Sequence, residues 1–163
     1  MIRKVEFERF SLTSAKPFEE VLAAMNDAIG HPDMAQFWRS TRQAQNFAEL
    51  ENSIKKVLGR TGLMSFVQFD HGSIVGKSTG RDEARMVRLV IGNPLIMQEM
   101  AKRVPDAGSY APVTVLVDER SDGVHISYDR MESLLAPYGD SEALAVARNL
   151  DSKVEALLSD AAG

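Results

Sequence analysis

The pair Asp122-Gly123 lies between two strand-like runs and limits the fold more than any other feature of this 163-residue chain. An Asp-Gly pair favours a tight turn, because glycine tolerates the left-handed backbone that hairpin turns need. The flanking runs are residues 112–118 and 124–130. A tight turn joins antiparallel neighbours, whereas parallel neighbours need a long crossover. The chain is therefore expected to contain an antiparallel or mixed sheet.

Three further runs have the alternation or the composition of strands. Apolar and charged side chains alternate from Val5 to Phe7 and continue one residue out of phase at Phe10. This pattern predicts a first strand with a bulge. Residues 63–69 and 86–91 are rich in apolar side chains, many of them β-branched or aromatic, and predict two more strands. Together with the hairpin, these runs give a sheet of about five strands.

Apolar side chains at helical spacing predict five helices. Asn46 with Glu49 three residues later is a capping-box pattern, and Asn93-Pro94 places a cap before a first-turn proline. The glycine-rich stretch 72–80 is expected to be an irregular connection. The predicted helices are residues 17–29, 33–41, 46–58, 93–103 and 141–161.

The order of these elements is strand, helices, two strands, helix, hairpin, helix. Strands grouped in this way, with helices between the groups, indicate an α+β fold with helices packed on one face of the sheet. We see no linker, no repeat and no low-complexity segment in the sequence. Residues 1–163 are therefore expected to form a single domain.

The composition excludes several kinds of site and partner. The chain has no cysteine, so disulfides and thiolate chemistry are excluded. Its three histidines lie far apart in the sequence, and we expect no metal site. The net charge is −4, and the nearest basic cluster, residues 81–88, is diluted by Asp82 and Glu83. Phosphate backbones need clustered cations, so we expect neither a nucleic-acid nor an anionic-membrane partner.

No run approaches the roughly 18 apolar residues that a membrane span requires. The first seven residues carry charges and contain no long apolar run, so no signal peptide is expected. The expected location is the cytoplasm.

The segment from Gly72 to Lys77 resembles a phosphate-binding loop, but its spacing is wrong. A P-loop has four residues between its first glycine and its Gly-Lys pair, whereas Gly72 and Gly76 enclose three. Gly80 also lies where the helix that follows a P-loop should begin. A missing residue changes the curvature of the loop, so the segment is not interpreted as a nucleotide site.

His125, Ser127 and Asp129 form another tempting set on one predicted strand. A catalytic triad needs its histidine between the nucleophile and the carboxylate, within hydrogen-bonding distance of both. Alternate residues on a straight strand lie roughly 6–7 Å apart. The three side chains are therefore expected to form a polar sheet face.

Asp70-His71 lies where a strand ends and a turn begins, a common position for functional groups. Histidine can act as a base, a proton shuttle or a ligand near neutral pH. The alternative is that Asp70 caps the turn while His71 packs on the surface. Both interpretations remain open at this point.

Five ordered motifs resemble the bacterial and archaeal domain of unknown function 302 family. They are an aspartate-histidine end of a strand, a Gly-Asn-Pro turn into a helix, a proline-led strand, a glycine-led strand that ends in Ser-Tyr, and a short tail. In this chain they read Phe69-Asp70-His71, Val90-Ile91-Gly92-Asn93-Pro94, Ala111-Pro112-Val113 to Val117-Asp118-Glu119, Gly123 to Asp129, and Leu134 to Tyr138.

The resemblance covers residues 63–138. It implies a TATA-binding-protein-like α+β arrangement and a homodimer, and it implies no reaction and no cofactor. Residues 31–62 are longer than the connection usual in the family, so we expect a helical insertion there.

The motif residues Asp70, His71, Asn93 and Tyr128 are expected to converge at one end of the sheet. The function that we favour is a small-ligand-binding or sensing homodimer that uses these four residues. One alternative is an enzyme with His71 as general base. Another is a structural or protein-interaction module. For Asn93 and Tyr128 we also consider structural roles, as a helix cap and as a core aromatic.

Overall fold

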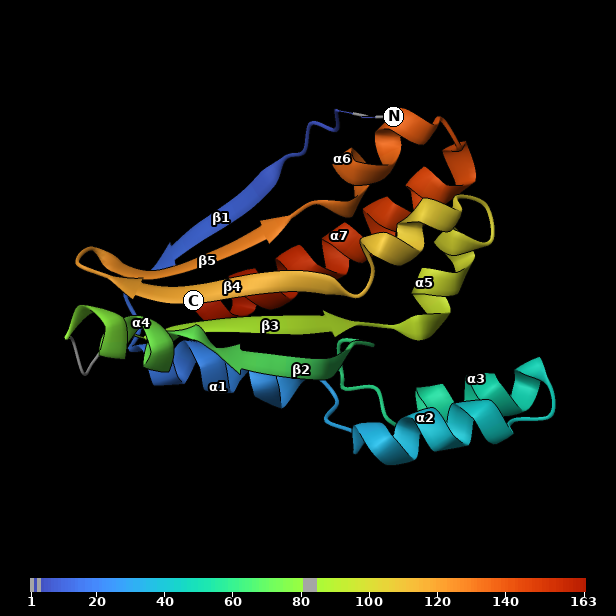
Figure 1. Ribbon diagram of the computed structural model, residues 1–163, viewed down its shortest axis with the longest axis horizontal. Helices are drawn as coiled ribbons and strands as arrows, with labels where there is room; N and C mark the ends of the chain where they lie inside the picture. Colours follow the sequence, from blue (N-terminus) through green and yellow to red (C-terminus); the bar gives the residue numbers. More distant parts are fainter. Residues whose placement is uncertain (1, 3, 81–84) are drawn as a thin grey trace.

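The computed structural model describes residues 2, 4–80 and 85–163 of the chain (Figure 1). The elements are β1 (Arg9–Ser14), α1 (Phe18–Ala28), α2 (Met34–Gln43), α3 (Phe47–Lys55), β2 (Met64–Asp70), α4 (His71–Thr79), β3 (Met86–Gly92), α5 (Pro94–Ala101), the 3-10 helix η1 (Pro105–Ser109), β4 (Val113–Arg120), β5 (Gly123–Asp129), α6 (Met131–Leu135), the 3-10 helix η2 (Ala136–Tyr138) and α7 (Ser141–Ala162).

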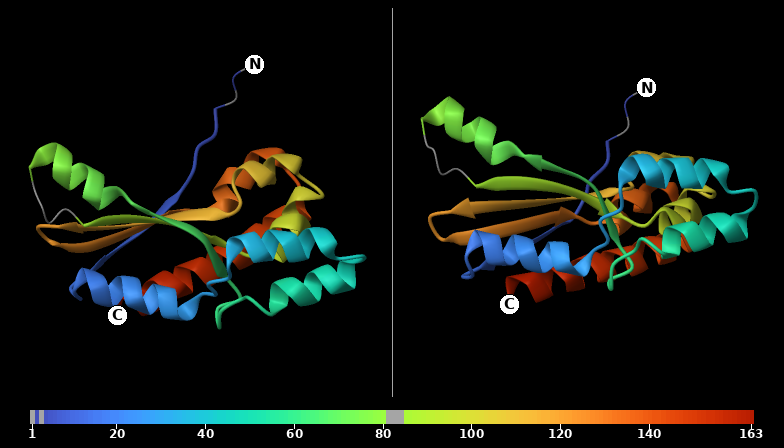
Figure 2. Two further views of the ribbon diagram at one scale, coloured as in Figure 1. Left: turned by 60° about the horizontal axis from the view of Figure 1, so that its bottom comes forward. Right: turned by 90° about the horizontal axis from the view of Figure 1, so that it is seen from below.

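The five strands form one antiparallel sheet in the order β1-β5-β4-β3-β2. The predicted hairpin is β4–β5, whose last register pair joins Arg120 and Gly123. Helices α1 and α7 lie side by side on one face of this sheet (Figure 2). The predicted α+β class, with an antiparallel sheet of about five strands, is confirmed. The TATA-binding-protein-like arrangement stays a prediction.

The main core lies between the sheet and the pair α1 and α7. Register and strand alternation direct Leu89, Val115 and Tyr128 toward these helices. All three side chains are almost completely buried, as are Val21 of α1 and Val154 of α7. The apolar stripe predicted for residues 141–161 therefore packs on the sheet.

The first strand begins later than the sequence suggested. Val5 and Phe7 lie outside the strand, which begins at Arg9 opposite Asp129, the last residue of β5. The prediction of a strand at Val5 was wrong, because the partner strand ends there. The chain before Arg9 is held instead by Glu8, whose carbonyl accepts from Arg130 N at 2.9 Å.

The glycine-rich stretch after β2 is helix α4, so the prediction of an irregular connection was wrong. Asp70 caps this helix, since its Oδ1 accepts from Ser73 N at 2.9 Å. Gly72 and Gly76 lie one turn apart on the buried side, and Gly80 ends the helix with a left-handed φ of 68°. A cap and a stop signal outweighed the low helix propensity of the glycines. Residues 81–84 of the dilute basic cluster lie outside the described residues.

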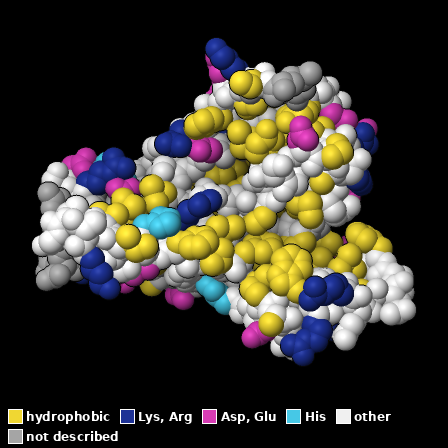
Figure 3. All heavy atoms as spheres, viewed as in Figure 1, with side chains coloured by type: hydrophobic (Ala, Val, Ile, Leu, Met, Phe, Trp, Pro, Cys, Tyr) yellow, Lys and Arg dark blue, Asp and Glu magenta, His cyan; other side chains and the backbone are white. Residues whose placement is uncertain are grey.

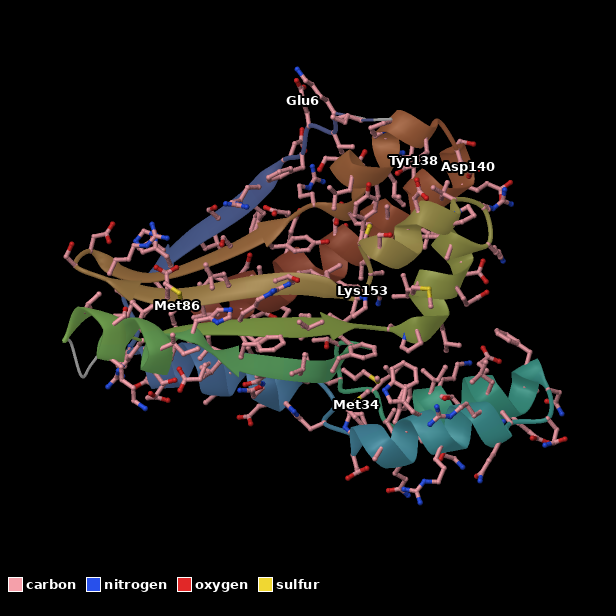
Figure 4. All side chains as sticks on the ribbon, in the orientation of Figure 1. Glu6, Met34, Met86, Tyr138, Asp140 and Lys153 are labelled. Atoms are coloured by element: carbon pink, nitrogen blue, oxygen red, sulfur yellow. The ribbon has the colours of Figure 1, made fainter. Side chains whose placement is uncertain are left out.

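Helices α2 and α3 form a hairpin that leaves and rejoins the sheet at almost one point. The N–H groups of Gly30 and Gly59 both donate to the carbonyl of Leu63, each at 2.9 Å. The hairpin has a small core of its own around Phe37, with Met34 packed against it (Figure 4). The rest of that core is Ile54 and Met64.

The sheet face opposite α1 and α7 is called the open face, and it includes Phe69, Arg88, Leu116 and Ser127. Register pairs these residues across β2, β3, β4 and β5. Figure 2 shows α4 and α2 at the two ends of the sheet, and Figure 3 shows hydrophobic side chains in a band across this face. Within the described residues, no helix combines the length and the apolar character needed to cross a bilayer.

Candidate ligand-binding site

Tyr128 lies in the core and not at a surface site. Its hydroxyl donates to Asp151 Oδ1 at 2.6 Å. The same carboxylate accepts from the N–H groups of Met131 at 2.8 Å and Glu132 at 2.9 Å. Asp151 is 1% exposed and so fixes the start of α6 while it holds Tyr128. The structural role considered for Tyr128 fits these contacts.

Tyr128 is expected to stay protonated at pH values where an exposed tyrosine ionises. Burial, together with the nearby charge of Asp151, raises its pKa above the ordinary value of 10.0. Above about pH 10 the unfolded chain therefore releases a proton that the folded protein keeps. The contribution of Tyr128 to the free energy of unfolding is complete below about pH 10 and is lost as the pH rises further. Tyr128→Phe should flatten this alkaline decline, measured by urea unfolding at a series of pH values.

Tyr138→Phe is the matched control for that measurement. Hydrogen bonds with Tyr110 and Asp106 raise the pKa of Tyr138 to about 12, but its side chain is only partly buried at the margin of the core. The alkaline decline caused by Tyr128 should persist in this variant. An equally steep decline in Tyr128→Phe and in the parent protein would contradict the assignment.

Asn93 caps α5, as its sequence context predicts. Its Oδ1 accepts from Leu95 N at 2.9 Å, and its Nδ2 donates to the carbonyl of Gly62 at 3.0 Å. The side chain thereby ties α5 to the loop before β2. Asn93 directly follows β3, so it lies at the end of the sheet that is close to α2.

Asp70 and His71 lie at the other end of the sheet from Asn93. Because β2 and β3 are antiparallel, Asp70 pairs with Val87 near the start of β3, whereas Asn93 follows its end. The His71 ring is parallel to Phe69 at a centroid distance of 5.9 Å. That contact lies on the open face, away from the buried hydroxyl of Tyr128. The structure does not bring the four predicted residues together.

Asp70 does line a hollow of about 410 Å³ between α1, α4 and the start of β3. Charges of both signs surround this hollow, including Glu19, Lys77 and Arg85. Arg85 already lies 3.5 Å from the Glu19 carboxylate. The arrangement is that of a solvated groove beneath a short helix.

The Ser-His-Asp run on β5 is a polar sheet face, as the strand geometry predicts. His125 Nε2 lies 2.8 Å from Asp122 Oδ1 in the hairpin turn. Asp129 instead pairs with Arg9 of β1 through two contacts of 2.6 and 3.0 Å. Histidine and aspartate are thus each engaged with a different neighbour.

An apolar pocket of about 310 Å³ lies at the Asn93 end of the sheet, and we call it the Trp38 pocket. Five separate parts of the chain form its walls: α2, the first half of β2, the β3–α5 turn with the start of α5, the segment from η1 to β4, and α7. Its lining residues are Trp38, Phe66, Gly92, Asn93, Pro94, Met97, Gly108, Ala111, Pro112, Val113 and Leu150.

Trp38 is the distinctive side chain of this pocket. Its ring lies 6.3 Å from Phe66 and 5.0 Å from Phe37, measured between ring centroids. Despite these contacts Trp38 remains 46% exposed, which is unusual for so large an apolar ring. None of the lining residues is charged. Only Asn93, whose two polar ends are already bonded, was among the residues predicted from the sequence.

The sequence contains one signal for this pocket, the aromatic pair Phe37-Trp38. That pair was not assigned to a site. Trp38 and Phe66 belong to different elements, and only the return of the α2–α3 hairpin to Leu63 brings them together. Gly108 lies on η1, which packs against α5, and Pro112 lies directly before β4. Spacing along the chain gives no indication of these contacts.

A protein-family comparison matches residues 38–161 to "Domain of unknown function DUF302". The chain belongs to the DUF302 family. The match extends on both sides of the predicted core at residues 63–138, so it includes most of α2 and all of α3. A comparison with curated proteins gave no match.

One solved structure similar to this DUF302 protein is the crystal structure of an uncharacterized conserved DUF302 protein from Bacillus stearothermophilus. The two share 14% sequence identity and superpose with a TM-score of 0.65, over 94% of this chain and 97% of that chain. At this identity the likeness shows a common fold. It carries no information about a ligand.

Proposed function

We propose that the protein binds a small, uncharged and largely apolar molecule in the Trp38 pocket. The observation that supports this proposal most is a half-exposed tryptophan beside a hollow whose walls come from five separate segments. Ligand sites are concave, mostly apolar and few in a protein. An exposed ring at the mouth of such a hollow gains stabilisation when a ligand covers it.

The size and the lining define the expected ligand. A volume of about 310 Å³ is at the lower end of the range of roughly 300–1,000 Å³ for small-molecule sites. The lining has no charged side chain to balance a ligand charge, and an unpaired charge is costly in an apolar site. Trp38 and Phe66 offer ring faces that favour a flat molecule.

Trp38 is the only tryptophan of the chain, so its fluorescence reports on this pocket alone. Titration with the uncharged probe N-phenyl-1-naphthylamine should quench Trp38 emission and give saturable probe fluorescence. Gly108→Phe adds a large ring at a residue that lines the hollow, and we expect it to weaken probe binding at least about tenfold. No saturable signal in the parent protein would contradict the proposal.

Gly108→Ala is the matched control for the blocked variant. A Cβ added at Gly108 meets no heavy atom within 4 Å beyond its chain neighbours. The alanine variant should therefore fold like the parent protein and bind the probe with nearly the same affinity. Equal binding by Gly108→Phe and Gly108→Ala would place the probe elsewhere and exclude the pocket.

The proposal includes a homodimer, which the family resemblance implies, and a location in the cytoplasm. Support comes from exposed apolar side chains near the edge strand β2, namely Val67, Phe69, Ile74 and Val75. Patches of this kind are typical of interaction sites, and an edge strand can pair with its own copy across a two-fold axis. Light scattering should give the mass of two chains; the mass of one chain at high concentration would exclude the dimer.

The enzyme alternative gains no support from the surroundings of His71. Its ring packs on Phe69, and the neighbouring Asp70 carboxylate caps α4 instead of orienting the imidazole. A general base also needs a partly dry pocket around it, and His71 is not among the residues that line the hollow beneath α4.

A further inference from the structure

A second hollow, of about 240 Å³, lies on the open face, and we call it the Arg9 hollow. It is separate in chemistry from the Trp38 pocket, although Val113 contributes to both. Its lining residues are Arg9, Tyr110, Val113, Thr114, Leu116, Ser127, Asp129 and Leu134. Five segments supply them: β1, the loop before β4, β4 itself, β5 and α6.

The sheet register explains why polar groups gather in this hollow. Arg9 lies opposite Asp129, and Leu116 lies opposite Ser127, on adjacent strands. Thr114 precedes Leu116 by two residues and so points to the same face. The floor of the hollow is therefore a patch of open-face side chains, and the segments that carry Tyr110 and Leu134 border it.

The Arg9–Asp129 ion pair forms one wall and can still make hydrogen bonds to a ligand. The guanidinium of Arg9 donates to both Asp129 oxygens, from Nε at 2.6 Å and from Nη2 at 3.0 Å. Arginine has five N–H groups, so three more remain available. Each carboxylate oxygen accepts one of these bonds and retains a further lone pair. The wall thus offers donors and acceptors side by side.

The hydroxyl of Tyr110 is oriented by its neighbours. Tyr138, beside η1 in Figure 4, donates its one proton to Asp106 Oδ2 at 2.8 Å. The 3.2 Å contact between the Tyr110 and Tyr138 hydroxyls therefore has Tyr110 as donor. The oxygen of Tyr110 keeps its lone pairs as acceptors at the hollow.

Two hydroxyls on the floor complete the set. Thr114 Oγ1 accepts from Arg88 Nη2 at 3.2 Å, so its own proton is left to donate. Ser127 offers both a donor and an acceptor. Leu116 and Leu134 also line the hollow, and their apolar surface suits C–H groups.

We propose that the Arg9 hollow binds one neutral polyhydroxylated ring, of the size of a monosaccharide or a cyclitol. Such a ring displays both hydroxyls and C–H groups, and the hollow offers both hydrogen-bonding groups and leucine side chains. The charge of Asp129 offsets that of Arg9, so the lining as a whole favours an uncharged ligand over an anion. The volume is below the usual range for drug-sized ligands, which fits a single ring.

The test is a binding measurement with four named probes: D-glucose, D-galactose, myo-inositol and tetrahydropyran. Amide chemical shifts of the full-length protein are followed by NMR during each titration. We expect saturable binding by at least one of the three polyols and none by tetrahydropyran, which has the ring without hydroxyls. A site that hydrogen-bonds ligand hydroxyls discriminates strongly against analogues that lack them.

Two variants locate the site, and two control for other causes. Ser127→Ala and Asp129→Asn should each weaken polyol binding about tenfold or more, because each removes a bonding group from the lining. Thr13→Val changes a hydroxyl residue at the other end of the open face, opposite His125, and should bind normally. Trp38→Ala should also bind the polyol normally, so failure of the Trp38 pocket proposal leaves this result unaffected.

Three outcomes overturn the proposal. The first is that no polyol gives a saturable shift. The second is that tetrahydropyran binds as tightly as the polyols, which shows an apolar site. The third is that folded Ser127→Ala and folded Asp129→Asn, checked by circular dichroism, bind as tightly as Thr13→Val. Weakened binding in the first pair alone supports the proposal.

Discussion

Replacement of Asp151 by alanine is expected to lower the free energy of unfolding by about 3–5 kcal/mol, since several buried donors lose their acceptor at roughly 1–3 kcal/mol each. The carboxylate is almost fully buried and accepts from Tyr128, Met131 and Glu132. Alanine leaves the tyrosine hydroxyl and two backbone N–H groups without this acceptor. An unsatisfied buried donor carries its full desolvation cost.

Urea unfolding followed by circular dichroism measures this effect, and Asp160→Ala is the matched control. Asp160 lies on the same helix but is exposed, so its loss should change stability by less than about 0.5 kcal/mol. Asp151→Asn should give an intermediate loss of stability. Its amide oxygen can still accept, but its NH2 group would face one of the three groups that donate to the carboxylate. A loss in Asp151→Ala no larger than in Asp160→Ala would show that the network does not hold β5, α6 and α7 together.

Replacement of Gly30 by alanine is expected to cost at least about 3 kcal/mol, since it overpacks a site with no room to relax. A Cβ added at Gly30 would collide with the carbonyl oxygen of Val57, and one added at Gly59 would collide with the backbone of Ala28 and Ile29. The two glycines allow the chain that leaves α1 to touch the chain that returns from α3. Backbone on both sides leaves no flexible side chain to move aside.

Hydrogen exchange and Trp38 emission distinguish local from global effects of Gly30→Ala. We expect faster exchange across α2 and α3 and an altered Trp38 emission maximum, because the hairpin carries the pocket wall. Gly108→Ala, where an added Cβ has open space, should leave both readouts unchanged. Parent-like exchange in Gly30→Ala would contradict the close packing of the two backbones.

Local signals in the sequence predicted the helices and strands well where residues within one short stretch determine the structure. Asp122-Gly123 turns β4 into β5, and Asn46 and Asn93 each accept from a backbone N–H of the helix that follows. These features depend on neighbours two or three residues away. Helix α4 was missed because its glycines have low propensity, whereas its cap, Asp70, was assigned to a turn.

The candidate site was harder to predict because its geometry depends on strand direction and on distant segments. Asp70 and Asn93 each lie next to the C-terminal end of a strand. Because β2 and β3 are antiparallel, these two strand ends lie at opposite ends of the sheet. Tyr128 has the alternation of a sheet residue, and alternation alone does not say which face the helices cover. Trp38 reaches Phe66 through the return of the α2–α3 hairpin.

The shared carbonyl of Leu63 has a consequence for how such a protein can change over evolution. The N–H groups of Gly30 and Gly59 both bond to it, so the excursion between them starts and finishes at one anchor. The cost of closing a loop grows slowly with its length. We therefore expect the segment between these glycines to be exchangeable for shorter or longer ones without loss of the sheet. Each exchange would give the same scaffold a differently shaped wall beside Phe66, and hence a different choice of bound molecule.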